Sequence, residues 1–111
     1  DGKFALVSDK GSNKIRTVDL ATGQVTTLSG VATAGFRDGP GTYSGSPTNT
    51  LAMLSAPMGI QVMPDGLSAV FCDSLNNRIR SVVLSTGFVT TIAGRSAPGF
   101  ADGPQTSPNG G

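Results

Sequence analysis

Short segments rich in Val, Ile, Leu and Thr recur along this chain, separated by clusters of Gly, Asp, Asn and Ser. Branched side chains pack well on a pleated surface, whereas the intervening residues favour turns. The pattern predicts strands at residues 4–8, 14–20, 24–28, 57–63, 67–72, 78–84 and 88–92. Because short turns join most of these segments, we expect an all-β fold of antiparallel meanders.

The chain contains an internal sequence repeat, with a constant offset of 64 residues between its two copies. Residues 9–40 match residues 73–104 at 17 of 32 positions without a gap, and the second copy has an additional strand at its start. Four-stranded antiparallel units repeated along a chain are the blades of a β-propeller, which arranges its sheets radially. The repeat therefore predicts about two blades of an incomplete propeller.

This interpretation divides the chain into four parts. Residues 1–30 form a first blade without its first strand, residues 31–53 a long inter-blade loop, residues 54–94 a second blade, and residues 95–111 the start of the next loop. Repeats bury their apolar faces against neighbours, so a stable array needs roughly three or more. We therefore expect either further blades of the same protein or self-assembly, and the first residue, Asp1 rather than Met, favours a processed chain or a fragment.

Composition and charge exclude some classes of function. Gly and Pro make up 23 of 111 residues and Glu is absent, which disfavours helices. The formal net charge is +1 with scattered basic residues, so the charge does not favour a nucleic acid or an anionic membrane as partner. No apolar run approaches the roughly 20 residues of a membrane span.

Several separated blocks carry a family resemblance. In chain order they are Ala-Pro-Met-Gly-Ile-Gln-Val, Pro-Asp-Gly, Phe-Cys-Asp-Ser-Leu-Asn-Asn-Arg-Ile-Arg, Val-Thr-Thr-Ile-Ala-Gly and Gly-Phe-Ala-Asp-Gly. This order resembles the NHL-repeat β-propeller family, in its variant with a Gly-Phe-x-Asp-Gly loop between blades. The first copy departs from the family pattern, with Gly-Ser-Asn-Lys where the family favours Asn-Asn-Arg. The resemblance implies a platform that binds proteins or RNA, and some related six-bladed propellers are hydrolases or lyases.

The residues that recur at the repeat offset are predicted to be structural. An Asp at the end of a strand can accept hydrogen bonds from loop amides, and an Arg in the following strand can reach carbonyls or an Asp of the adjacent blade. In the Gly-Phe-x-Asp-Gly loops the Asp can tie the turn and the Phe can fill the gap between blades. The full set is Asp9, Asn13, Arg16, Phe36, Asp73, Asn77, Arg80, Phe100 and Asp102.

The chain offers no combination of residues for catalysis. It has no histidine, so the Ser/His/Asp, Cys/His and common zinc arrangements cannot be assembled within it. The single cysteine, Cys72, matches Ser8 of the first copy and is predicted to be a small packed side chain. No carboxylate cluster suggests calcium. We predict no catalytic residue, no metal and no cofactor, with the alternative of a hydrolase or lyase whose catalytic residues lie elsewhere.

Recognition is expected where the copies diverge, above all in the long inter-blade loop, because loops of this length are uncommon unless functional or flexible. In a propeller this loop and the loop between second and third strands share a face, which gives a candidate interaction surface of Lys10, Arg37, Asp38, Tyr43 and Asn76. A solvated spacer is the alternative. The Ser/Thr/Pro-rich residues 42–50 and 106–108 suit O-glycans of extracellular segments. We expect a non-enzymatic protein-interaction or structural scaffold, extracellular or at the cell surface, with an RNA-binding propeller as a further alternative.

Overall fold

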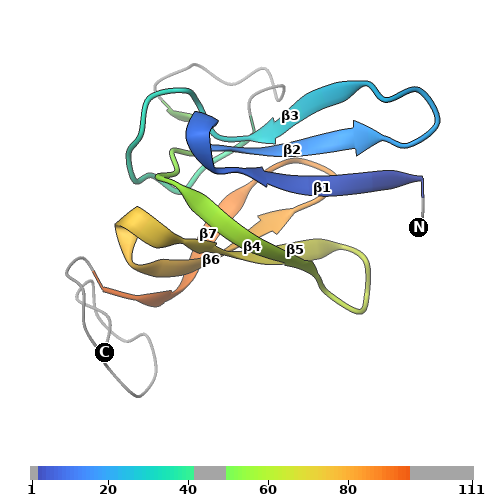
Figure 1. Ribbon diagram of the computed structural model, residues 1–111. Helices are drawn as coiled ribbons and strands as arrows, with labels where there is room; N and C mark the ends of the chain where they lie inside the picture. Colours follow the sequence, from blue (N-terminus) through green and yellow to red (C-terminus); the bar gives the residue numbers. More distant parts are fainter. Residues whose placement is uncertain (1–2, 42–49, 96–111) are drawn as a thin grey trace.

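The computed structural model describes residues 3–41 and 50–95, which form two antiparallel sheets stacked on one another (Figure 1). The first sheet has the order β1-β2-β3, with β1 Phe4–Asp9, β2 Lys14–Asp19 and β3 Val25–Ser29. The second has the order β4-β5-β6-β7, with β4 Pro57–Val62, β5 Ser68–Asp73, β6 Arg78–Val83 and β7 Val89–Gly94. Tyr43, Phe100 and Asp102 lie outside the described residues.

The predicted all-β class is confirmed, and each strand lies within two residues of its predicted bounds. Two short 3-10 helices, η1 Lys10–Ser12 and η3 Ser74–Asn76, occupy predicted turns. Each ends at an asparagine in the left-handed region, Asn13 with φ 61° and Asn77 with φ 59°. Asparagine tolerates this conformation better than most residues. None of the described residues belongs to a helix long and apolar enough to cross a membrane.

The two sheets are copies in backbone detail as well as in sequence. In the first sheet Val7 lies opposite Arg16, and in the second Phe71 lies opposite Arg80. The register of β2 against β3 shifts immediately before Arg16, and that of β6 against β7 shifts immediately before Arg80. Each arginine therefore follows a bulge, a feature that re-aims side chains.

The hydrophobic core lies between the sheets, and the two faces that meet there are not equivalent in the repeat. One face of the first sheet contributes Ile15 and Leu28, with Leu6 partly buried. The second sheet contributes Ala69, Phe71, Val82 and Val89 to the core. These four residues lie on one face of the sheet, because residues directly opposite in neighbouring strands share a face. Thus the two sheets meet through non-equivalent positions of the repeat.

The segment that connects the sheets, predicted as one long inter-blade loop over residues 31–53, adds to this core. Leu51, Ala52 and Leu54 are buried, and Arg37 and Met53 form an isolated antiparallel bridge between the two arms of the connection. The apolar run Leu-Ala-Met-Leu at residues 51–54 is the signal that could have revealed this. The sequence reading took the Gly- and Pro-rich text around it as a sign of exposure.

The repeat supplies a matched test of how closely the sheets pack. Gly23 and Gly87 occupy equivalent hairpin turns with φ 76° and 74°. A Cβ on Gly23 would meet nothing within 4 Å, whereas one on Gly87 would collide with the Leu28 carbonyl oxygen and lie 2.9 Å from the Gly41 Cα.

We therefore expect Gly23→Ala to lower the free energy of unfolding by about 1 kcal/mol through left-handed strain alone. Gly87→Ala should cost about 1–3 kcal/mol more, because its methyl group forces the sheets apart. Urea denaturation of both variants measures the difference. Equal losses would mean that the turn at Gly87 does not set the separation of the sheets.

Candidate functional site

The most elaborate polar site is a buried ion cluster between the second sheet and the connecting segment. The side chain of Arg80 is completely buried, as is that of Asp73. Arg80 Nη1 donates to Asp73 Oδ2 and to the Met53 carbonyl, each at 2.7 Å. Arg80 Nη2 donates to Asp38 Oδ1 at 2.9 Å and to the Arg37 carbonyl at 2.8 Å. We call Arg80, Asp73 and Asp38 the Arg80 cluster.

Asp73 is positioned by its place at the end of β5 and ties three segments together. Its Oδ1 accepts a hydrogen bond from the Ser55 amide at 2.7 Å, and its Oδ2 accepts one from Asn76 Nδ2 at 2.6 Å. A buried carboxylate needs such donors, because unpaired charge in the interior is costly. Asp73 therefore joins the connecting segment to η3 and β6.

Phe36 lies at the rim of this cluster. The guanidinium carbons of Arg78 and Arg80 lie 3.9 Å and 4.7 Å from the centre of its ring, which is the geometry of cation–π contacts. The Phe36 residue is 42% exposed, so it does not fill a gap between the sheets as the sequence reading expected. Its ring instead covers the two arginines at the edge of the stack.

The first copy of the cluster is incomplete. Arg16 Nε and Asp9 Oδ2 are 3.3 Å apart, and these side chains are 27% and 35% exposed. The two atoms are not aligned for a hydrogen bond, and Arg16 Nε has no other hydrogen-bond partner among the described residues. The same two residue types at the same register thus form a buried cluster in the second sheet and an open pair in the first.

The connecting segment holds the two 3-10 turns at one end of the molecule (Figure 1). Asn13 Oδ1 accepts a hydrogen bond from the Ala56 amide, and Asn13 Nδ2 donates to the Ala32 carbonyl. The Ala56 carbonyl accepts a hydrogen bond from Ser74 Oγ. Ala56 has a φ of 54°, a strained conformation for alanine that these bonds on both sides hold in place.

The described residues of the candidate interaction surface differ in whether their side chains form internal bonds. Lys10 is exposed in η1. Arg37 Nε donates to the Leu51 carbonyl, Asp38 is a member of the Arg80 cluster, and Asn76 donates to Asp73 and to the Gly35 carbonyl. Arg37, Asp38 and Asn76 therefore take part in internal bonds, although the side chain of Asp38 stays 43% exposed. Leu75, which is 71% exposed in η3, is an apolar contact residue that the sequence reading did not single out.

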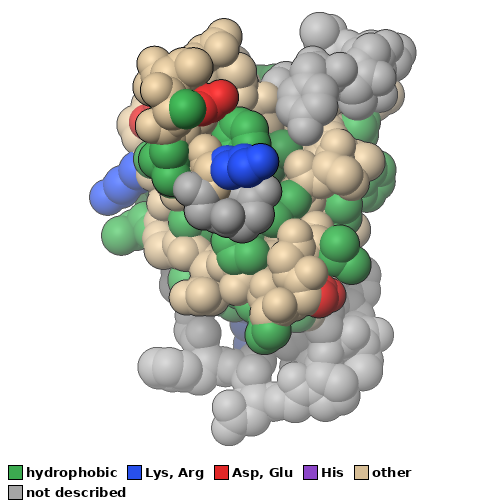
Figure 2. Space-filling model, turned by 90° about the vertical axis from the view of Figure 1, so that its right-hand side faces the viewer, with side chains coloured by type: hydrophobic (Ala, Val, Ile, Leu, Met, Phe, Trp, Pro, Cys, Tyr) green, Lys and Arg blue, Asp and Glu red, His purple; other side chains and the backbone are tan. Residues whose placement is uncertain are grey.

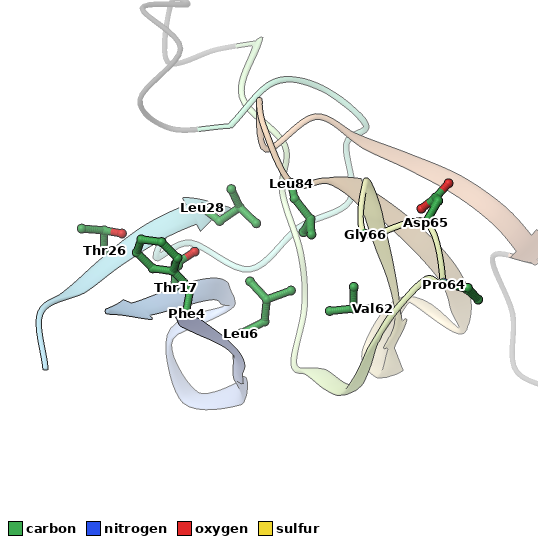
Figure 3. Close-up of a pocket in the computed structure, with 10 residues that line it drawn as sticks. All are labelled: Phe4, Leu6, Thr17, Thr26, Leu28, Val62, Pro64, Asp65, Gly66 and Leu84. Atoms are coloured by element: carbon green, nitrogen blue, oxygen red, sulfur yellow. The ribbon is translucent and has the colours of Figure 1, made fainter. Parts of the chain in front are cut away.

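A cavity of about 680 Å³ opens between the sheets at the opposite end, where the β4–β5 turn lies. Leu6 and Leu28 approach it from the first sheet, and Val62 and Leu84 from the second (Figure 3). Figure 2 looks at this end and shows hydrophobic side chains around a central basic side chain. The carboxylate of Asp65 at its edge accepts a hydrogen bond from the Leu67 amide, so it stabilises the turn.

The described residues bring together no group of three or more His, Cys, Asp or Glu that could hold a metal ion. Cys72 is exposed on the outer face of the second sheet, which contradicts its prediction as a packed side chain. The physical reason is that no further sheet formed by residues 3–41 and 50–95 covers this face.

No family model matches the chain, but it is similar to proteins of known sequence or structure. It is 32% identical to "Protein SUPPRESSOR OF QUENCHING 1, chloroplastic" of Arabidopsis thaliana over 111 aligned residues, which cover 93% of this chain and 10% of that protein. It superposes on a crystal structure named "Putative phosphatase" from Bacteroides thetaiotaomicron with a TM-score of 0.60 and 25% identity, over 85% of this chain and 21% of that one. The chain therefore spans about a tenth and about a fifth of these two proteins.

The two copies of the Asp/Arg pair provide a matched test of the cluster. Asp73→Asn should lower the free energy of unfolding by about 3 kcal/mol, because it removes the buried carboxylate closest to a fully buried guanidinium. Asp9→Asn removes the equivalent, partly exposed carboxylate and should cost about 1 kcal/mol or less. Denaturant titration of the two variants measures both values. If both variants lose the same free energy of unfolding, the Arg80 cluster is not the buried contact that holds the connecting segment on the second sheet.

Proposed function

We propose that this chain is a segment of an NHL-type β-propeller and that it serves as a non-enzymatic protein-interaction or structural scaffold. The observation that carries the proposal is the stacking of two meander sheets that are copies of one another. Their shared register and the repeat offset of 64 residues fit successive blades of a propeller. The solved structure with a TM-score of 0.60 supports a common fold over most of the chain.

The scaffold role is favoured by what the polar residues do. Three charged side chains of the repeat, Asp38, Asp73 and Arg80, form internal bonds in the Arg80 cluster. The described residues offer no group of three or more His, Cys, Asp or Glu that could hold a metal ion. The exposed side chains at the end with η1 and η3 include Lys10 and Leu75. Rigid sheets that present such loops are suited to recognition.

A hydrolase is the second candidate, because the solved protein that the chain resembles is named a phosphatase. Since the chain corresponds to about a fifth of that protein, its catalytic groups would come from outside the present sequence. A hydrolase of this kind should release p-nitrophenol from p-nitrophenyl phosphate when the complete protein is assayed with added divalent metals. The scaffold proposal expects no release above that of the buffer, and metal-dependent turnover would overturn its non-enzymatic part.

The interaction role is tested with two leucines at opposite ends of the molecule. Leu75 in η3 and Leu67 in the β4–β5 turn are 71% and 68% exposed, so an aspartate at either position should leave the fold intact. We expect Leu75→Asp to reduce capture of a partner from the native source at least about tenfold, because burying a charge at a contact is costly. Leu67→Asp serves as the matched control and should capture normally.

Quantitative mass spectrometry of the captured proteins, with a thermal melt of each variant, gives the answer. Equal capture by both variants would exclude the η3 end as the contact surface.

A further inference from the structure

The connecting segment fills only one end of the space between the two sheets. At the end with η1 and η3, its Ala52 and Leu54 are buried in the core. At the opposite end none of its described residues lines the space, and a cavity of about 680 Å³ remains between the sheets. The cavity therefore exists because the sheets are held together at one end while nothing in the described part of the chain fills the other.

This cavity lies between faces that already pack on one another. On the first sheet, Leu6, Thr17 and Thr26 share the inward face, because Thr17 lies opposite both of the others in the neighbouring strands. On the second sheet, Val62 lies opposite Ala69, which belongs to the core. A further sheet of a longer protein that packed on either outward face would not enter this space. Such a sheet would leave the cavity open.

The walls of the cavity change from apolar to polar toward its mouth. Leu28 is 4% exposed, and Leu6 and Leu84 are partly buried against the core, so these leucines form the inner wall. Thr26 is exposed and Thr17 is half-buried, and their hydroxyl groups can both donate and accept hydrogen bonds. An occupant with an apolar body and a polar end matches this order.

Phe4 adds an aromatic wall near the mouth. It is 54% exposed, and Figure 3 shows it with Thr17 and Thr26 on the first-sheet side of the cavity. The equivalent residue at the repeat offset is Ser68, so the repeat itself does not require an aromatic side chain at this position. A flat ring system that lies against an aromatic ring gains a stacking contact in addition to burial.

Size and charge narrow the occupant further. Cavities that hold small organic molecules have volumes of about 300–1,000 Å³ and are mostly apolar, with a few polar groups. Asp65 at the edge is the one charged side chain among the described residues that line the cavity. This carboxylate would repel an anion placed there, whereas a neutral hydroxyl group suits the two threonines.

We propose that the cavity binds a neutral small molecule that has a flat apolar ring system and a hydroxyl group. The rings lie against Leu6, Leu28 and Leu84, and the hydroxyl group forms hydrogen bonds with Thr17 and Thr26. This site goes beyond the scaffold role proposed above and does not depend on it, because the η3 contact lies at the other end of the molecule.

2-Naphthol has these features and is a suitable fluorescent probe, because the chain has no Trp and a single Tyr to interfere. We expect it to bind saturably, one molecule to each chain, both to this chain and to the complete protein. Naphthalene lacks the hydroxyl group and should bind at least about tenfold more weakly, because the threonine hydroxyls then lose a partner. 2-Naphthoate, an anion, should also bind at least about tenfold more weakly than 2-naphthol.

Fluorescence titration with each of the three probes measures these affinities. Equal affinities for 2-naphthol and naphthalene would show that apolar surface alone binds them. Binding to this chain but not to the complete protein would show that another segment fills the cavity. Either result overturns the proposal, as does the absence of saturable binding of 2-naphthol.

Two valines of similar exposure test whether the probe occupies the cavity. Val62 lines it and is 40% exposed, whereas Val83 is 38% exposed and lies outside the cavity. Val62→Phe should raise the dissociation constant for 2-naphthol at least about tenfold by filling the space, and Val83→Phe should leave it unchanged. Circular dichroism checks that both variants fold as the parent chain does. Equal binding by the two variants would place the probe outside the cavity and overturn the proposal.

The hydroxyl contact has its own matched pair of variants. Thr26→Val removes one hydroxyl group from the cavity, and Thr90→Val makes the same change at the equivalent position of the second sheet, which is exposed and lies outside the cavity. Thr26→Val should weaken binding of 2-naphthol about fivefold and leave that of naphthalene unchanged, because only 2-naphthol makes the hydrogen bond. Thr90→Val should change neither affinity. If Thr26→Val weakens binding of both probes equally, or of neither, the hydroxyl contact is overturned.

Discussion

A guanidinium buried between two layers of structure needs its charge balanced and its N–H groups bonded, because water cannot reach it. Arg80 meets most of this requirement, because its Nη1 and Nη2 bind two aspartates and two carbonyls that come from β5 and both arms of the connecting segment. Its buried Nε has no hydrogen-bond partner among the described residues. The rest of the arrangement depends on this requirement. These bonds hold both arms of the connecting segment against the second sheet, beside Ala52 and Leu54, which enter the core.

The strands and the repeat could be predicted because their causes are local. Alternating branched side chains, and Gly, Asn or Asp at turns, act over a few residues, and the repeat offset shows twice where each strand begins. Arg80 was predicted to reach carbonyls or an Asp of the adjacent blade. It does bind two carbonyls, but its aspartates are Asp73 of its own sheet and Asp38 of the connecting segment. Asn13 and Asn77 end their turns in the left-handed conformation that asparagine tolerates.

The remaining features depend on contacts that lie far apart in sequence. Arg16 and Arg80 each lie between an isoleucine and a hydroxyl residue, so their immediate neighbours do not distinguish the open pair from the buried cluster. Asn76 is a residue type that is common in surface loops, yet its side-chain amide donates hydrogen bonds to Asp73 and to the Gly35 carbonyl. Phe36 was expected to fill a gap, but its ring stays at the rim because two guanidinium groups already lie beneath it. The repeat predicts which side chains can be buried, but it does not predict which of them a neighbouring segment covers.

The two sheets meet through faces that are not equivalent in the repeat, and this has a geometric consequence. A further sheet that packed on the second sheet as the second packs on the first would be rotated by the same angle. If that angle divides a full turn, successive sheets return to the first and close a ring; if it does not, they continue as an open spiral. The angle depends on how closely two backbones approach at Gly41 and Gly87, where a Cβ would find no room. Two glycines therefore help to set the symmetry of any larger array.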